Sequence, residues 1–260
     1  MTNRLLLLSP EEKKRGAITF SAGNMAQGLA FGCAIAGMKG VVVMPASASP
    51  LKAAATRGYG ADVILHGDVS EAHAHCMALI EKHGYVFARF DDQDVMEGHA
   101  TLGLEIAEDL PDLDALIAPV GGGGLIGGII MALRAAGSKA RIFGIEPENA
   151  DVMRQSLAAG KAVRSPPGPT IADGLAPPFV GERCFPLVRD HAEGIALVSE
   201  AEIGNAIKTL LLRMKLLAEG AGAASLAGLL SGRMPLKPGS KVVCVLSGGN
   251  IDPERLKTIL

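Results

Sequence analysis

The stretch that decides the fold is Ala115-Leu-Ile-Ala-Pro-Val-Gly-Gly-Gly-Gly-Leu-Ile-Gly-Gly-Ile-Ile130, in which four consecutive glycines separate two apolar runs. The first run predicts a buried strand and the second predicts a helix, so the glycines form the turn between them. Such a turn directs bare backbone N–H groups at one point, with the positive end of the helix dipole behind them, and this arrangement binds phosphate. A flexible turn without a ligand is the alternative, but glycine lowers stability and this density of glycine needs a reason.

Composition limits the classes of protein to consider. The 260 residues are 48% hydrophobic and 20% charged, which is enough apolar sequence for one large domain or two modest ones. A net charge of −2, two Tyr, seven Phe and no Trp leave no footprint for nucleic acid. Four separated cysteines predict free thiols in a reducing compartment, and no apolar stretch is long enough to span a membrane. We therefore expect a cytoplasmic protein with neither a nucleic acid nor a membrane as partner.

Short apolar runs alternate with helical patterns along the chain. The runs predict strands at 17–20, 40–44, 62–65, 85–88, 115–120, 141–145, 194–198 and 241–246. The patterns predict helices at 24–36, 70–83, 95–110, 125–136, 200–217 and 221–230, and capping boxes begin at Ser9 and Ser199. This alternation predicts an α/β fold in which helices cover parallel sheets.

Two further strands end in small polar turns. Ser21-Ala-Gly-Asn24 follows the strand at 17–20, and Ser247-Gly-Gly-Asn250 follows the strand at 241–246. Ligands of open parallel sheets bind beyond the carboxyl ends of the strands. Together with the four glycines, these turns predict a phosphate cup, a pocket for a small acid and a partner for a ring heteroatom.

A dinucleotide site is the rival interpretation of the glycine turn. Gly122-x-Gly124-x-x-Gly127 satisfies the fingerprint, and Glu146 follows about 20 residues later, where a ribose-binding acid is expected. The fingerprint usually follows the first strand of its domain, whereas four predicted strands precede it here. An NAD-binding protein also leaves the two serine turns unexplained, so we rank this alternative lower.

Five motifs in a fixed order resemble a known family. They are Ser21-Ala-Gly-Asn-Met-Ala-Gln-Gly28, Val120-Gly-Gly-Gly-Gly-Leu125, Gly144-Ile-Glu-Pro-Glu148, Thr170-Ile-Ala-Asp-Gly174 and Leu246-Ser-Gly-Gly-Asn250. They resemble the threonine/serine dehydratase and serine racemase branch of the fold-type-II pyridoxal 5'-phosphate (PLP) enzymes, from Asn3 to Asp252. The motifs are specific for the family but not for the substrate.

The resemblance implies a fold like that of tryptophan synthase beta, with two open parallel-sheet αβα domains. Residues 16–93 would form a small cofactor and substrate domain. Residues 1–15 and 94–260 would form the large PLP-binding domain, of which we expect the N-terminal part to be missing. The family also implies a homo-oligomer, expected to be a dimer.

The resemblance also implies roles for single residues. The cofactor phosphate would be held by Gly121, Gly122, Gly123, Gly124 and the Leu125 amide. The pyridine ring would meet Ser247 at its nitrogen, Asn24 at its hydroxyl and the carboxylate of Glu219 close by. The substrate carboxylate would be received by the loop of Ser21, Ala22, Gly23 and Met25.

The catalytic lysine of the family has no match in the chain. In the family this lysine forms a Schiff base with PLP, takes the substrate α proton, and lies in Ser-Phe-Lys-x-Arg-Gly-Ala. Lys13-Lys-Arg-Gly-Ala17 imitates the end of that motif, but Lys13 lies inside the helix capped by Ser9 and only eight residues before Ser21. We therefore expect no catalytic residue within the chain and place the Schiff-base lysine just before Met1.

Other departures bear on the reaction and on a metal. Ala22 stands where racemases carry a serine that protonates the opposite face, which favours β-elimination over racemisation. A divalent cation in this branch uses Glu146, the carbonyl of Ala150 and an acid two residues further on, where this chain has Val152. A hard cation needs several oxygen ligands, so we expect no metal, with Glu146 and Ala150 as a weak candidate pair.

These inferences predict a PLP-dependent ammonia-lyase. It would convert threonine, serine or a related 3-hydroxy amino acid to a 2-oxo acid and ammonia. A catalytically silent fragment that binds PLP or another phosphorylated ligand is the alternative from a different class. A serine racemase-like protein is a lesser alternative.

Overall fold

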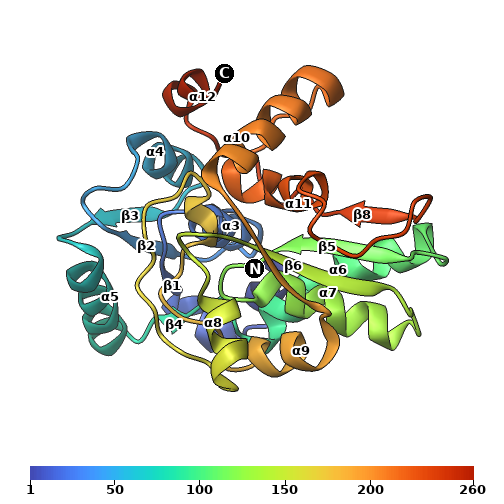
Figure 1. Cartoon of the computed structure of the whole chain (residues 1–260). Helices are drawn as coiled ribbons and strands as arrows, with labels where there is room; N and C mark the ends of the chain where they lie inside the picture. The colour runs from blue at the N-terminus through green and yellow to red at the C-terminus, as the bar shows by residue number, and fades with distance from the viewer. The chain divides into compact units, whose positions relative to one another are not determined.

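The computed structural model describes all residues, 1–260, which divide into two compact units at Met1–Gly98 and His99–Leu260 (Figure 1). Each unit contains one four-stranded sheet, and every strand pairing in both sheets is parallel. The predicted fold class, an α/β chain with two parallel sheets covered by helices, is therefore confirmed.

The sheet of the first unit has the strand order β3-β2-β1-β4. Its elements are α1 (Thr2–Leu6), α2 (Pro10–Arg15), β1 (Ala17–Phe20), α3 (Asn24–Ile35), β2 (Gly40–Met44), α4 (Pro50–Gly58), β3 (Asp62–Leu65), α5 (Val69–His83) and β4 (Val86–Phe87). Alternate side chains of β2 point to opposite faces, as the period of a strand requires. Val42 and Met44 pack with Leu5 of α1 and Leu29 of α3, whereas Val41 and Val43 pack with α5. Helices thus cover both faces of this sheet.

The sheet of the second unit has the order β7-β6-β5-β8. Helix α6 (Gln93–Asp109) crosses the division between the units and enters this one. The remaining elements are β5 (Ala115–Pro119), α7 (Gly124–Ala135), β6 (Arg141–Pro147), α8 (Val152–Ala159), the 3-10 turn η1 (Asp173–Leu175), α9 (Cys184–His191), β7 (Gly194–Val198), α10 (Glu200–Thr209), the π-turn η2 (Leu210–Met214), α11 (Gly220–Leu230), β8 (Val242–Cys244) and α12 (Pro253–Ile259).

Two apolar layers enclose this second sheet. Leu116 and Ala118 of β5 pack into a layer with α7, α8 and α9, while Ala115 and Ile117 pack into a layer with α10 and α11. Figure 1 shows α10 and α11 on the opposite side of the sheet from α7 and α9. All five residues of β5 are buried, which explains why this strand reads as a continuous apolar run in the sequence.

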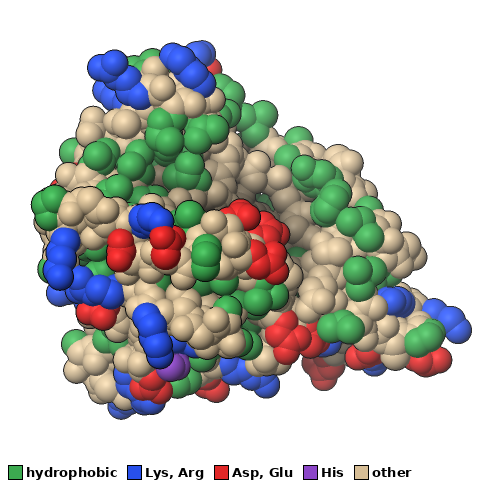
Figure 2. Space-filling model, turned by 90° about the vertical axis from the view of Figure 1, so that its right-hand side faces the viewer, with side chains coloured by type: hydrophobic (Ala, Val, Ile, Leu, Met, Phe, Trp, Pro, Cys, Tyr) green, Lys and Arg blue, Asp and Glu red, His purple; other side chains and the backbone are tan.

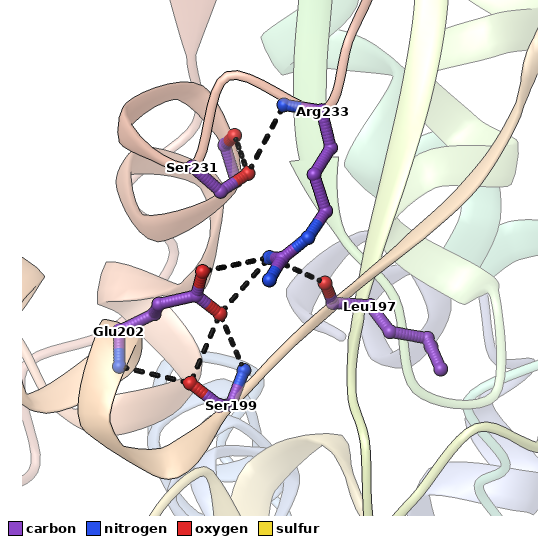
Figure 3. A network of polar contacts seen from close by, with 6 residues as sticks. Leu197, Ser199, Glu202, Ser231 and Arg233 are labelled. Atoms are coloured by element: carbon purple, nitrogen blue, oxygen red, sulfur yellow. Dashed lines mark hydrogen bonds and ion pairs between the residues drawn. The ribbon is translucent and has the colours of Figure 1, made fainter.

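The start of α10 is held by a network of polar contacts (Figure 3). Ser199 and Glu202 form the predicted capping box, with the Ser199 N–H donating to the Glu202 carboxylate at 2.8 Å. The Arg233 guanidinium binds the same carboxylate at 2.8 Å and donates to the Leu197 carbonyl at 3.0 Å. The predicted capping box at Ser9 is also present, and both predictions are confirmed.

Several element boundaries differ from those predicted. The helix expected at 200–217 is α-helical only over Glu200–Thr209, continues as a π-turn and stops at Lys215, whose φ is 60°. The strand expected at 241–246 is shorter, Val242–Cys244, because only that part pairs with β5. Residues 1–15 pack within the first unit. The assignment of residues 1–15 and 94–98 to the large domain stays a prediction.

The surface mixes charges of both signs. On the face drawn in Figure 2, lysine and arginine side chains lie among aspartate and glutamate side chains rather than in one large patch. No helix is both long and apolar enough to cross a membrane.

Candidate functional site

The glycine loop Gly121–Gly124 connects β5 to α7, as predicted. The strand ends at Pro119, and Val120 donates the last bond of the ladder to the Ile145 carbonyl of β6 at 2.8 Å. Gly123 caps α7 with a φ of 96°, a left-handed conformation that glycine adopts without strain. The loop therefore turns the chain from a buried strand into a buried helix within four residues.

Neighbouring segments fill the space behind the loop. A Cβ on Gly121 would lie 3.1 Å from Pro177 Cδ, and a Cβ on Gly123 would lie 2.8 Å from both Met153 Cε and Cys184 Cβ. The Gly122 carbonyl accepts a hydrogen bond from the Gly181 N–H at 2.9 Å. Glycine is thus required for space as well as for conformation, and the loop is held in one shape.

The N–H groups of the loop are available to a ligand. No backbone hydrogen bond is donated by Gly121, Gly122 or Gly123, and the N–H groups of Gly124 and Leu125 lie in the first turn of α7, where a helix offers them no acceptor. A helix N-terminus lined by unpaired N–H groups favours a phosphate. The loop accordingly fits the phosphate of PLP.

Ser247 and the glycine loop follow the carboxyl ends of neighbouring strands in the second unit. Strands β5 and β8 are parallel neighbours whose last pair is Ile117 and Cys244, so Val120 and Ser247 both lie three residues beyond it. Ser247 is exposed, and the segment that follows is held by the Glu219 N–H, which donates to the Gly248 carbonyl at 3.1 Å. This places one neutral hydroxyl at the same sheet edge as the glycine loop.

Glu219 precedes the first turn of α11 and is 4% exposed. Its carbonyl accepts from the Ala223 N–H at 2.9 Å, which fixes it as the residue that caps α11. The residues of this unit that are predicted to bind PLP therefore lie on three neighbouring parts of the fold. They are Gly121–Gly124 and Leu125 between β5 and α7, Ser247 after β8, and Glu219 at the start of α11, which packs on the same sheet.

The loop of Ser21, Ala22, Gly23, Asn24 and Met25 connects β1 to α3 in the first unit. Ser21 accepts a hydrogen bond from the Gly23 N–H at 3.2 Å through its hydroxyl, and its own N–H donates to the Val43 carbonyl at 3.2 Å. Gly23 caps α3, so Asn24 and Met25 contribute N–H groups of the first helical turn. Such a turn suits a small anion such as a carboxylate.

Glu146 is fully buried at the end of β6 and caps α8 rather than standing free. Its two carboxylate oxygens accept from the N–H groups of Met153 at 2.8 Å and Arg154 at 2.9 Å. Burial raises the pKa of Glu146 to about 8, with Asp151 adding to the rise and the two N–H bonds opposing it. Asp151 itself binds Arg154 and Gln155. No group of three His, Cys, Asp or Glu side chains is placed to hold a metal, and the absence of a metal stays a prediction.

This fold and these loops belong to one family. The sequence model of the family described as "Pyridoxal-phosphate dependent enzyme" matches residues 1–248, and the chain belongs to that family. PLP is therefore the cofactor of its class, and the residues of the glycine loop fit its phosphate.

Individual members of the family and solved structures resemble the chain over nearly its whole length. The chain is 46% identical over 252 residues to the L-threonine ammonia-lyase of Geobacter sulfurreducens, a match that covers 96% of this chain and 62% of that protein. The processed form of threonine deaminase isoform 2 from Solanum lycopersicum superposes with a TM-score of 0.92 at 35% identity, covering 99% of this chain and 76% of that one. Maize serine racemase superposes with a TM-score of 0.93 at 32% identity, covering 99% and 80%. The chain thus spans less than two thirds of the length of the curated ammonia-lyase.

Sequence reasoning missed the residues that shape the loops from behind. Gly181, Cys184 and Met153 support the glycine loop but lie 29 to 63 positions from Gly121–Gly124 and carry no motif. Sequence reasoning also assigned no role to Gly222 in α11. The only signal for this position was the glycine itself, because a glycine inside a buried helix indicates that another segment approaches the helix closely.

Proposed function

We propose that the protein to which this chain belongs is a PLP-dependent ammonia-lyase for L-threonine, L-serine or a related 3-hydroxy amino acid. The observation that carries the proposal is the parallel pair β5 and β8, which end at one sheet edge in the glycine loop and in Ser247. The 46% identity to an L-threonine ammonia-lyase supports the reaction and the substrate class.

The second unit would bind the cofactor. PLP, when bound, supplies an electron sink for negative charge that develops on the substrate. The N–H groups from Gly121 to Leu125 hold its phosphate, and the Ser247 hydroxyl donates to its ring nitrogen. A neutral partner leaves that nitrogen unprotonated, which sets how strongly the ring withdraws electrons. Glu219 provides a buried carboxylate in the same unit.

The first unit would bind the substrate and the ring hydroxyl. The loop of Ser21, Ala22, Gly23 and Met25 would receive the substrate carboxylate, chiefly on the N–H groups of Ala22 and Met25, because those of Ser21 and Gly23 already donate within the unit, and Asn24 would meet the ring hydroxyl. Ala22 offers no hydroxyl that protonates the opposite face of the α carbon, so elimination of the β hydroxyl is favoured over racemisation. This residue separates the proposal from the serine racemase alternative.

We also propose that no lysine of residues 1–260 bonds the cofactor aldehyde. Lys13 is the one lysine in a sequence resembling the family motif, and it lies in the capped helix α2 with its Nζ donating to the Leu6 carbonyl at 2.9 Å. In this chain PLP would then be held without a covalent bond, as in the silent-fragment alternative.

A binding experiment tests the cofactor site. We expect the chain to bind PLP, measured by equilibrium dialysis, and Gly123→Ala to weaken binding at least tenfold, because a Cβ at that φ strains the loop and meets Met153 and Cys184. Gly137→Ala is the matched control: Gly137 also has a positive φ of 76°, at the far end of α7, with open space around its Cβ position. Equal loss in both variants would contradict a phosphate role for the loop.

Chemistry distinguishes the functional alternatives. After borohydride reduction of the PLP-loaded chain, we expect no cofactor adduct on any lysine by mass spectrometry; an adduct overturns the proposed absence of the lysine. For the whole protein, equal yields of 2-oxo acid and ammonia from L-threonine or L-serine support the ammonia-lyase. Conversion of L-serine to D-serine instead would support the racemase.

A further inference from the structure

The first turn of α11 lies directly against the backbone that follows Ser247. The Glu219 N–H donates to the Gly248 carbonyl at 3.1 Å. A Cβ placed on Gly222 would collide with that same carbonyl oxygen and stand 2.9 Å from the Gly248 nitrogen. Gly222 thus permits a contact between two backbones that any side chain prevents.

This glycine is required by space and not by conformation. Gly222 has no positive φ, so another residue fits its helical backbone. Helix α11 cannot retreat, because the next residues, Ala223 and Ala224, are fully buried in the layer beneath the sheet. A methyl group at position 222 must therefore displace the backbone of Gly248, the residue that directly follows Ser247 in the chain.

We propose that Gly222 is a positioning residue for Ser247. The Glu219 N–H holds the Gly248 carbonyl, and the bare face of Gly222 lets that peptide seat against α11. Together they fix the direction of the Ser247 backbone and hence of its hydroxyl towards the ring nitrogen of PLP. The inference rests on the proposed function, since it takes Ser247 as the partner of that nitrogen.

A double-mutant cycle on cofactor binding tests the coupling. We expect Ser247→Ala and Gly222→Ala each to weaken PLP binding about tenfold, the loss of one hydrogen bond. The double variant should bind PLP within about twofold of Ser247→Ala, because a misplaced hydroxyl and a missing one are equivalent. Additive losses overturn the proposal. Inorganic phosphate, which reports only on the glycine loop, should bind both single variants within about twofold of the wild type, and a parallel loss of phosphate binding also overturns it.

Gly228→Ala is the matched control for damage to α11. A Cβ on Gly228 meets the Ile145 side chain, with Cγ1 at 2.8 Å, so it stresses the same helix without touching the Ser247 loop. We expect this variant to lower the melting temperature while leaving the ratio of PLP to phosphate affinity unchanged. The same change of ratio as in Gly222→Ala would show a structural effect only and would overturn the proposal.

Hydrogen exchange separates this inference from the proposed function. If the wild-type chain does not bind PLP, the proposed function fails, yet the positioning of Ser247 remains measurable. We expect amide exchange across residues 245–250 to be faster in Gly222→Ala than in the wild type, and unchanged in Gly228→Ala. Equal exchange in all three proteins contradicts the positioning role whatever the cofactor result.

Discussion

Gly123 and Lys215, both in the second unit, adopt a left-handed conformation for different reasons. Gly123, with a φ of 96°, is a glycine at the start of α7, where the conformation is free of strain. Lys215, with a φ of 60°, is the one non-glycine residue with a positive φ, and it ends the π-turn η2. Strain of this kind is kept only where the surroundings impose it. Here the Leu216 N–H donates to the Leu210 carbonyl at 3.0 Å, which fixes the turn.

Relief of that strain should stabilise the second unit. A residue with a Cβ in the left-handed conformation lowers the free energy of unfolding by about 1–2 kcal/mol. Glycine removes this strain, but the greater conformational entropy that it gives the unfolded chain offsets about 0.5–1 kcal/mol of the gain. We expect Lys215→Gly to raise the free energy of unfolding by about 0.5 kcal/mol, measured by urea denaturation. Lys215→Ala loses the same bond from Nζ to the Leu212 carbonyl as Lys215→Gly but keeps the strain, so it should show no gain. A gain of the same size in both variants would refute the explanation.

At the scale of elements, helix caps carry contacts beyond the helix itself. Glu202 caps α10 and also binds Arg233, whereas Glu71 caps α5 in the same way and has no arginine bound to its carboxylate. The arginine lowers the pKa of Glu202, together with its bonds to Ser199. The cap of α10 therefore ties β7, α10 and the loop after α11 together, as Figure 3 shows.

The Arg233 contact predicts that a glutamate-to-glutamine substitution lowers the free energy of unfolding by different amounts at the caps of α10 and α5. Glu202→Gln should destabilise its unit more than Glu71→Gln destabilises the other, because only the former leaves an arginine without its carboxylate. Ser199→Ala should cost about 1 kcal/mol, as is usual for an N-cap. Urea denaturation of the three variants, followed by circular dichroism, provides the comparison. Equal costs for the two glutamine variants would show that the Arg233 contact adds nothing.

Element types were easier to predict than element ends. The period of two or 3.6 residues reports which faces are buried, and the strands at 17–20, 40–44, 62–65 and 194–198 match the structure at both ends. The helix expected at 200–217 failed beyond Thr209, where Leu212, Met214 and Leu217 are exposed. Apolar residues at helical spacing there do not face a core, so their periodicity carried no information on packing.

At the scale of the whole molecule, the sequence predicted the two parallel sheets and the loops at their carboxyl edges. These follow from chain order, because a strand that ends in glycine and restarts as a helix is visible locally. The residues that pack against the glycines were not predictable from the sequence. Cys184 and Met153 meet Gly123, and Gly248 meets Gly222, through tertiary packing alone. Which residues face Gly123 or Gly222 depends on how helices seat on the sheet.

The stability of the molecule should depend on pH through one buried carboxyl group. Burial raises the pKa of Glu146 from an ordinary 4.5 to about 8, so the folded state keeps a proton that the unfolded state has lost in this range. The contribution of Glu146 to stability is then greatest below pH 4.5 and is lost as pH rises through about 8. His99 has the opposite sign, because burial lowers its pKa from 6.5 to about 4, and its contribution rises with pH below 6.5. Between pH 6.5 and 8 the N-terminal ammonium of Met1, whose pKa burial lowers from 8.0, opposes Glu146, but its shift is the smaller one and Glu146 dominates.

Denaturation at several pH values in that window tests the argument. We expect the free energy of unfolding of the wild type to decrease from pH 6.5 to 8, and Glu146→Gln to abolish the decrease, since glutamine does not titrate. At pH 6.5 the variant should be less stable than the wild type, because its amide nitrogen cannot accept one of the two N–H bonds from Met153 and Arg154, and the difference should shrink as pH rises. His99→Asn should keep the decrease and change only the acid range. An undiminished slope in Glu146→Gln would mean that the carboxyl stays ionised, held by the N-terminus of α8 against the cost of its burial.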